Sequence, residues 1–154
     1  MSMNPSEFFW WRFLVLVTAI LIAFGLSLAL LPNLAQQGFS LMVYFSAQHV
    51  DTFGADAVAY IRLVTAVLGC VMVGWGVVLM YLALGPLKRG SRDAWWMFVL
   101  SLTCWFIPDT TYSFISGFWQ NAVLNITFAL AFAIPLLALR KFARTSDFSS
   151  DTRV

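Results

Sequence analysis

The sequence predicts an all-α, polytopic membrane protein with four transmembrane helices packed as an antiparallel bundle. Of its 154 residues, 61% are apolar and only 10% are charged, whereas soluble domains carry roughly 25% charged residues. Four long apolar stretches are separated by polar connections, and the basic residues gather in alternate connections. Residues 1–142 are expected to form one transmembrane domain, because this length suits a single bundle.

The first two spans follow directly from uncharged runs. A membrane helix needs about 20 mostly apolar residues to cross roughly 30 Å of hydrocarbon. The first span is expected over about residues 13–31, which is longer than the apolar core of a signal peptide and lacks a cleavage site. The second is expected over 57–84, before the helix-stopping pair Gly85-Pro86. Residues 32–56 form an outer loop, whose apolar piece 39–45 is expected to lie at the membrane interface.

The third span, expected over 94–115, contains polar residues. Its apolar part, residues 94–107, would measure only about 21 Å as a helix, so the span must continue through Pro108 and Asp109. Proline removes a helical hydrogen bond, which predicts a kink or a break near Pro108. The fourth span is expected over 119–139, ahead of Arg140 and Lys141.

The basic residues predict the orientation, because Lys and Arg gather in cytoplasmic connections. Eight of the nine lie on one side if both termini and the 85–93 loop share a compartment, and only Arg62 lies towards the other. The eight are Arg12, Lys88, Arg89, Arg92, Arg140, Lys141, Arg144 and Arg153. We therefore expect a multi-pass protein of the bacterial inner (cytoplasmic) membrane with both termini cytoplasmic. Residues 143–154, rich in Ser, Thr and Asp, are expected to form a disordered tail.

Polar side chains recur on the helix faces expected to look inward. Asp109 and Ser113 are four residues apart, as are Asn121 and Asn125, so each pair shares a helical face. A turn at residues 116–117 would place Ser113 opposite Asn121, and Asp109 opposite Asn125. Because intramembrane ionisable groups are functional candidates, we predict a ligand-binding site in the outer half of the membrane. Its members are Arg62, Asp109, Ser113, Asn121 and Asn125.

Small residues indicate the packing faces of the first two spans, because they let helix backbones approach closely. Ala66, Cys70 and Gly74 recur every four residues on the second span, with Gly69 and Gly76 nearby. Arg62 continues this row at its outer end. It could reach inward to pair with Asp109, or extend outward to the interface.

One pattern, W-F-x-P-D-T-x-x-S-x-x-x-G-x-x-x-N-x-x-x-N, runs from the third span into the fourth. It is carried by Trp105, Pro108, Asp109, Thr110, Ser113, Gly117, Asn121 and Asn125. The pattern resembles one of small uncharacterised bacterial four-helix membrane proteins. The resemblance covers the second to fourth spans and implies no activity.

Several function classes are disfavoured. The net charge of +2 is too small to indicate nucleic-acid binding, and a single histidine excludes a bis-histidine haem site within one subunit. Cys70 and Cys104 have no metal-ligand spacing. No catalytic motif is visible, so the sequence favours a non-enzyme, and we predict no catalytic residue, metal or cofactor.

Three functions stay open. The protein could bind an amphipathic small molecule or lipid in the outer-leaflet pocket. It could be an accessory or structural subunit of a larger membrane complex, with the polar side chains only joining its helices. It could also be a small transporter or channel, formed as a homo-oligomer, with Asp109 as the coupling group.

Overall fold

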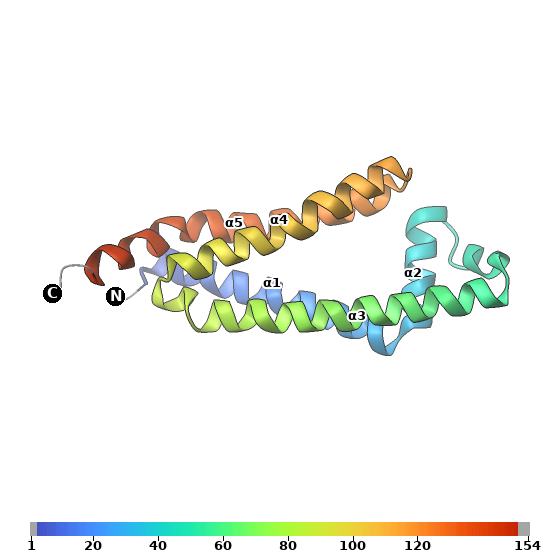
Figure 1. Cartoon of the computed structure of the whole chain (residues 1–154), viewed down its shortest axis with the longest axis horizontal. Helices are drawn as coiled ribbons and strands as arrows, with labels where there is room; N and C mark the ends of the chain where they lie inside the picture. Colours follow the sequence, from blue (N-terminus) through green and yellow to red (C-terminus); the bar gives the residue numbers. More distant parts are fainter. Residues whose placement is uncertain (1–2, 151–154) are drawn as a thin grey trace. The chain divides into compact units, whose positions relative to one another are not determined.

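The computed structural model describes the backbone of residues 3–150 and the side chains of residues 3–143. Within these residues every regular element is helical, as the sequence predicted (Figure 1). The five α-helices are α1 (Pro5–Leu30), α2 (Pro32–Tyr44), α3 (Ala55–Leu84), α4 (Arg92–Ile115) and α5 (Trp119–Ser150). Two short 3-10 helices, η1 (His49–Phe53) and η2 (Leu87–Arg89), precede α3 and α4.

Three of the described helical stretches are long and apolar enough to cross a membrane. They are Pro5–Leu30, Ala55–Arg89 and Trp119–Ala143. They correspond to the first, second and fourth expected spans. α4, with 24 residues, is long enough, but its charged first turn and its polar turn around Asp109 make it less apolar.

The structure differs from the expected break near Pro108. α4 is continuous from Arg92 to Ile115, with Pro108 inside it, so the helix is not broken there, and a kink stays a prediction. A side-chain hydrogen bond supports the next turn, because Ser113 Oγ donates to the backbone oxygen of Asp109 at 2.7 Å.

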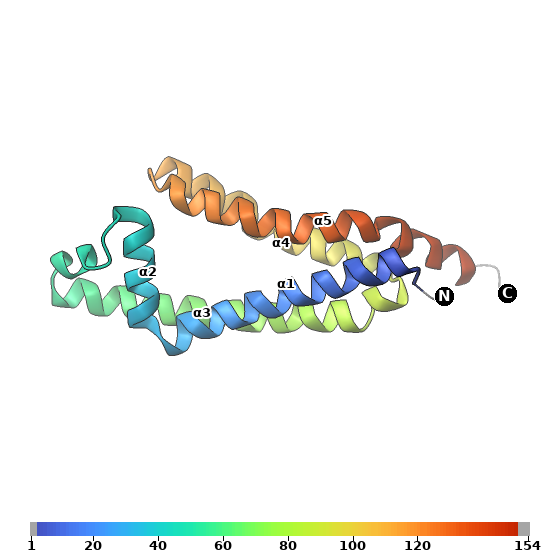
Figure 2. The same ribbon diagram turned by 180° about the vertical axis from the view of Figure 1, so that it is seen from behind.

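The expected outer loop 32–56 is largely helical. α2 begins with a proline, whose missing N–H costs nothing in a first turn. It ends at Tyr44, and the C-cap residue Phe45 takes φ +56° while its N–H donates to the Leu41 oxygen. Polar residues at Gln36 and Ser40 share one buried face of α2, and both diagrams show α2 running across α3 (Figures 1 and 2). Gln36 and Ser40 are four residues apart, the spacing of one helical turn. This spacing indicates a helix, although the mixed composition of the segment obscures it.

α5 extends beyond the expected fourth span, and the disordered tail expected over residues 143–154 stays a prediction. α5 continues past its apolar part to Ser150, and residues 151–154 lie outside the described residues. No glycine or proline occurs between residues 141 and 150 to stop the helix. The cytoplasmic position of this segment stays a prediction.

The chain divides into two compact units. Unit 1 comprises Met1–Ala19 and Val78–Val154, and unit 2 comprises Ile20–Val77. The centre of unit 1 is the antiparallel pair of α4 and α5 (Figure 1), whose buried residues include Phe98 and Phe132. Two indole groups in unit 1 donate to backbone oxygens: Trp11 Nε1 to Ala83 at 2.8 Å, and Trp95 Nε1 to Leu136 at 2.7 Å.

Unit 2 depends on close backbone approach between α1 and α3. A Cβ added at Gly69 would lie 2.5 Å from both the Ala29 nitrogen and the Gly25 oxygen. One added at Gly76 would lie 2.5 Å from Ile22 Cγ1, whereas one at Gly74 would meet nothing within 4 Å. The packing face of α3 therefore follows Gly69 and Gly76, and the expected row through Gly74 is displaced by one helical position.

Candidate functional site

The connection between α4 and α5 fixes how their polar residues meet. Gly117 has φ +81°, in the left-handed region that glycine adopts without steric cost. The N–H of Phe118 donates to the Ser113 oxygen at 2.8 Å, which closes the end of α4. With so short a connection, the last turns of α4 lie beside the first turns of α5 (Figure 2).

Asn121 joins the two helices through its side-chain amide. Its Nδ2 donates to Ser113 Oγ at 2.8 Å and to Asp109 Oδ1 at 3.1 Å. Ser113 Oγ also lies 3.4 Å from Asp109 Oδ1. The predicted pairing of Ser113 with Asn121 is therefore present, and Asp109 shares the same amide.

The predicted pairing of Asp109 with Asn125 is not present. Asn125 Nδ2 instead donates to Thr110 Oγ1 at 3.4 Å, and both residues are buried. Counting residues from the turn correctly predicted which turns of α4 and α5 lie side by side. It did not resolve the difference of about 100° between the directions of neighbouring side chains on a helix.

Trp105 completes the surroundings of the carboxylate and was not among the predicted site residues. Its Nε1 donates to Asp109 Oδ2 at 3.1 Å. Trp105 lies four residues before Asp109, so the spacing that linked Asp109 with Ser113 could have found it too. Thr110 was missed for a different reason, because only the packed hairpin shows which residue faces Asn125.

The carboxylate of Asp109 is half-buried and retains acceptor capacity. A carboxylate offers about four acceptor sites, and three donor groups contact the carboxylate of Asp109. Within its own unit, no basic side chain of residues 3–19 and 78–143 forms an ion pair with it. The group that would best fill the remaining site is therefore a hydrogen-bond donor or a cation.

The fifth predicted site residue, Arg62, lies in unit 2. Its Nε donates to Gln36 Oε1 at 3.2 Å, and the arginine side chain is exposed. Gln36 is only 4% exposed, and its Nε2 has no hydrogen-bond partner among the described residues. The structure thus gives Arg62 a partner that the sequence did not suggest, and an Arg62–Asp109 pair stays a prediction.

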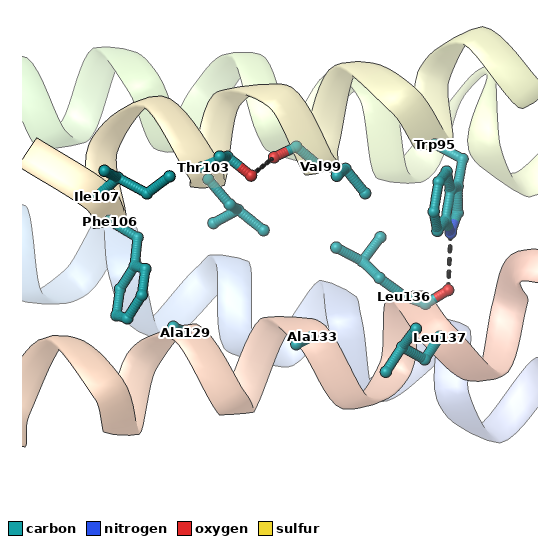
Figure 3. Close-up of a pocket in the computed structure, with 10 residues that line it drawn as sticks. Trp95, Val99, Thr103, Phe106, Ile107, Ala129, Ala133, Leu136 and Leu137 are labelled. Carbon is teal, nitrogen blue, oxygen red and sulfur yellow. Dashed lines mark hydrogen bonds between the residues drawn. The ribbon is translucent and has the colours of Figure 1, made fainter.

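An apolar groove of about 440 Å³ is lined by residues of both α4 and α5 (Figure 3). None of the predicted site residues lines it. Its lining residues are Trp95, Val99, Leu102, Thr103, Phe106, Ile107, Ala129, Ala133, Leu136 and Leu137. Its polar groups are already bonded within the protein, because Thr103 Oγ1 donates to the Val99 oxygen and Trp95 Nε1 to the Leu136 oxygen.

The other reactive residues are dispersed. Among the described residues, no group of three or more His, Cys, Asp or Glu side chains is placed to hold a metal ion. Cys70 and Cys104 are free thiols. His49 stacks on Tyr44 with ring centroids 4.2 Å apart.

Comparison with known proteins adds no assignment to this geometry. No model of a known protein family, no curated protein and no solved structure matches the chain.

Proposed function

We propose that this chain is a four-span protein of the bacterial inner membrane, with both termini cytoplasmic, that binds an amphipathic small molecule or lipid. The three apolar helices support the membrane setting. α4 is the fourth span, because it packs along α5 and its 24 residues extend about 36 Å, enough to cross the hydrocarbon. The cytoplasmic side follows from the eight basic residues grouped there.

The polar end of the ligand contacts Asp109 in the outer half of the membrane. The observation that carries this proposal is a half-buried carboxylate that accepts from neutral donors and keeps acceptor capacity for a further donor. A ligand hydroxyl or ammonium group fits that position. Ser113 and Asn121 orient the carboxylate, and Asn125 with Thr110 holds the next turn of the hairpin. Arg62 remains a predicted member of the site.

The test is mass spectrometry of the small molecules and lipids retained by gently extracted protein. Asp109→Asn keeps the shape of the side chain but removes its charge, so we expect the retained amphiphile to be lost. Thr127→Val serves as the control, because Thr127 lies on α5 outside the cluster and bonds only to its own helix at Val123. Equal retention by Asp109→Asn and wild type would contradict the proposal.

A second candidate function is an accessory subunit of a larger membrane complex. It is favoured by the hydrogen bonds within the cluster, which join α4 to α5 directly. This alternative predicts a protein partner that co-purifies in a fixed ratio. It also predicts that Asp109→Asn leaves that ratio unchanged, which quantitative mass spectrometry of the co-purified proteins would measure.

A further inference from the structure

Two arginines meet at the end of the α4–α5 pair opposite to the Asp109 cluster. Arg92 is the first residue of α4, and Arg140 lies where the apolar part of α5 ends. Both line one small hollow together with Trp95, Trp96 and Ala143. The antiparallel packing of the two helices brings these distant parts of the sequence together.

Neither arginine is neutralised within the described part of the chain. Both side chains are exposed, and neither forms an ion pair or side-chain hydrogen bond among the described side chains of residues 3–143. Asp93, which follows Arg92 in the sequence, likewise forms no ion pair with them there. Two guanidinium groups beside one hollow therefore present ten N–H donors and no acceptor, which suits the negative charge and the acceptor oxygens of a phosphate group.

The hollow and the apolar groove are neighbours on the α4–α5 pair, because Trp95 lines both. From Trp95 to Ile107 the groove follows α4 over twelve residue steps, or about 18 Å. One leaflet of hydrocarbon is about 15 Å thick, half of the full core. Since the polar groups of the groove are bonded internally, it has no free partner for a polar occupant. Its length and chemistry fit one acyl chain (Figure 3).

We propose that α4 and α5 bind one anionic phospholipid of the cytoplasmic leaflet, with its phosphate between Arg92 and Arg140 and an acyl chain in the groove. Basic pockets between helices on the cytoplasmic side are a recognised setting for such head groups. Trp95 and Trp96 lie at the junction of head group and chain, where indole rings are favoured. The leaflet follows from the orientation proposed above, but the site is separate from Asp109.

The head-group test titrates detergent-solubilised protein with dioleoyl phosphatidylglycerol and dioleoyl phosphatidylcholine, with binding measured by native mass spectrometry. Wild type should bind the anionic lipid more tightly. R92Q/R140Q should weaken that binding by about thirtyfold, the effect expected for two basic side chains near the surface. R12Q/R89Q removes the same charge from the same membrane face and should weaken it much less.

Equal binding of the two lipids by wild type would overturn the head-group site, because it would show no recognition of the anionic charge. Equal losses in both double variants would overturn it in favour of general charge attraction. Asp109→Asn should leave phosphatidylglycerol binding unchanged, so failure of the Asp109 proposal and failure of this one are distinguishable. Excess inorganic phosphate should not displace the lipid, and full displacement would indicate a site for free phosphate.

The groove is tested separately by its volume. Ala133→Phe places a ring inside the groove and should lower binding of the dioleoyl lipid, whereas Ala138→Phe adds the same ring at an exposed position of α5. Wild type should also bind dihexanoyl phosphatidylglycerol at least tenfold more weakly than the dioleoyl form, a measurement that needs no variant. Equal binding of short and long chains would show that the groove holds no acyl chain.

Discussion

The two units of this protein hold their helices together by different means. In unit 1, α4 and α5 are joined at one end by side-chain hydrogen bonds around Asn121, and at the other by the Trp95 indole on a backbone oxygen. In unit 2, α1 and α3 approach through Gly25 and Gly69 with no room for a side chain. The comparison teaches that the α4–α5 hairpin depends on particular hydrogen-bond donors and acceptors, whereas the α1–α3 contact depends on glycines that have no side chain.

The largest expected effect is steric and falls on unit 2. Gly69→Ala places a Cβ 2.5 Å from two backbone atoms of α1, so the helices must separate, at a cost of about 3 kcal/mol. We expect a marked fall in the thermal melting temperature of the purified protein. Gly74→Ala is the matched control, because its Cβ would meet nothing within 4 Å. Equal melting temperatures for the two variants would contradict the close α1–α3 contact.

A smaller effect is expected from the polar hairpin. Asn121→Ala removes two hydrogen bonds between α4 and α5 and should destabilise the protein by about 1 kcal/mol, since such bonds are worth roughly 0.6 kcal/mol each in membrane proteins. Thr127→Ala, which removes a bond within α5 only, should have less effect. Unfolding in a graded mixture of detergent and denaturant would compare them. If Thr127→Ala cost as much, the cluster would not be what joins the helices.

The smallest effect is expected from removing the indole hydrogen bonds of unit 1 while keeping an aromatic ring at each position. Trp95→Phe keeps an aromatic ring but loses the hydrogen bond to Leu136, and should cost at most about 1 kcal/mol. Trp11→Phe loses the corresponding bond to Ala83 and should cost a similar amount. Tryptophan fluorescence during unfolding would report both. A much larger loss in either variant would mean that the shape of the indole, and not its N–H group, supports the contact.

The fold was predictable where one property of the sequence decides it. Uninterrupted apolar runs identified three helices able to cross a membrane, and Gly85 with Pro86 marked the end of α3 correctly. α2 was missed, because a helix of 13 residues with a polar buried face has neither the length nor the composition of a span. The predicted packing face of α3 was wrong by one helical position. Gly69 and Gly74 are the same residue type, so only the packed structure shows which of them contacts α1.

For the candidate site, the sequence predicted the position along the α4–α5 hairpin but not every hydrogen-bond partner. The spacing from Gly117 correctly brought Ser113 to Asn121, since a short turn leaves little freedom of register. It could not assign the partner of Asn125, which depends on helix rotation. Gln36 was invisible as a partner of Arg62, because the two are distant in sequence. The groove and the Arg92–Arg140 hollow are spaces between side chains, so no pattern of residues encodes them.

The tight turn at Gly117 bears on how the protein enters its membrane. In the proposed four-span arrangement, α4 alone would carry an exposed carboxylate into hydrocarbon, which is unfavourable for an isolated helix. Because the turn keeps Asn121 within a few residues of Ser113, the amide that caps this carboxylate arrives with the next helix at little cost in loop entropy. In that arrangement we expect α4 and α5 to insert as a pair, because α5 supplies the polar partner that the carboxylate of α4 needs in hydrocarbon.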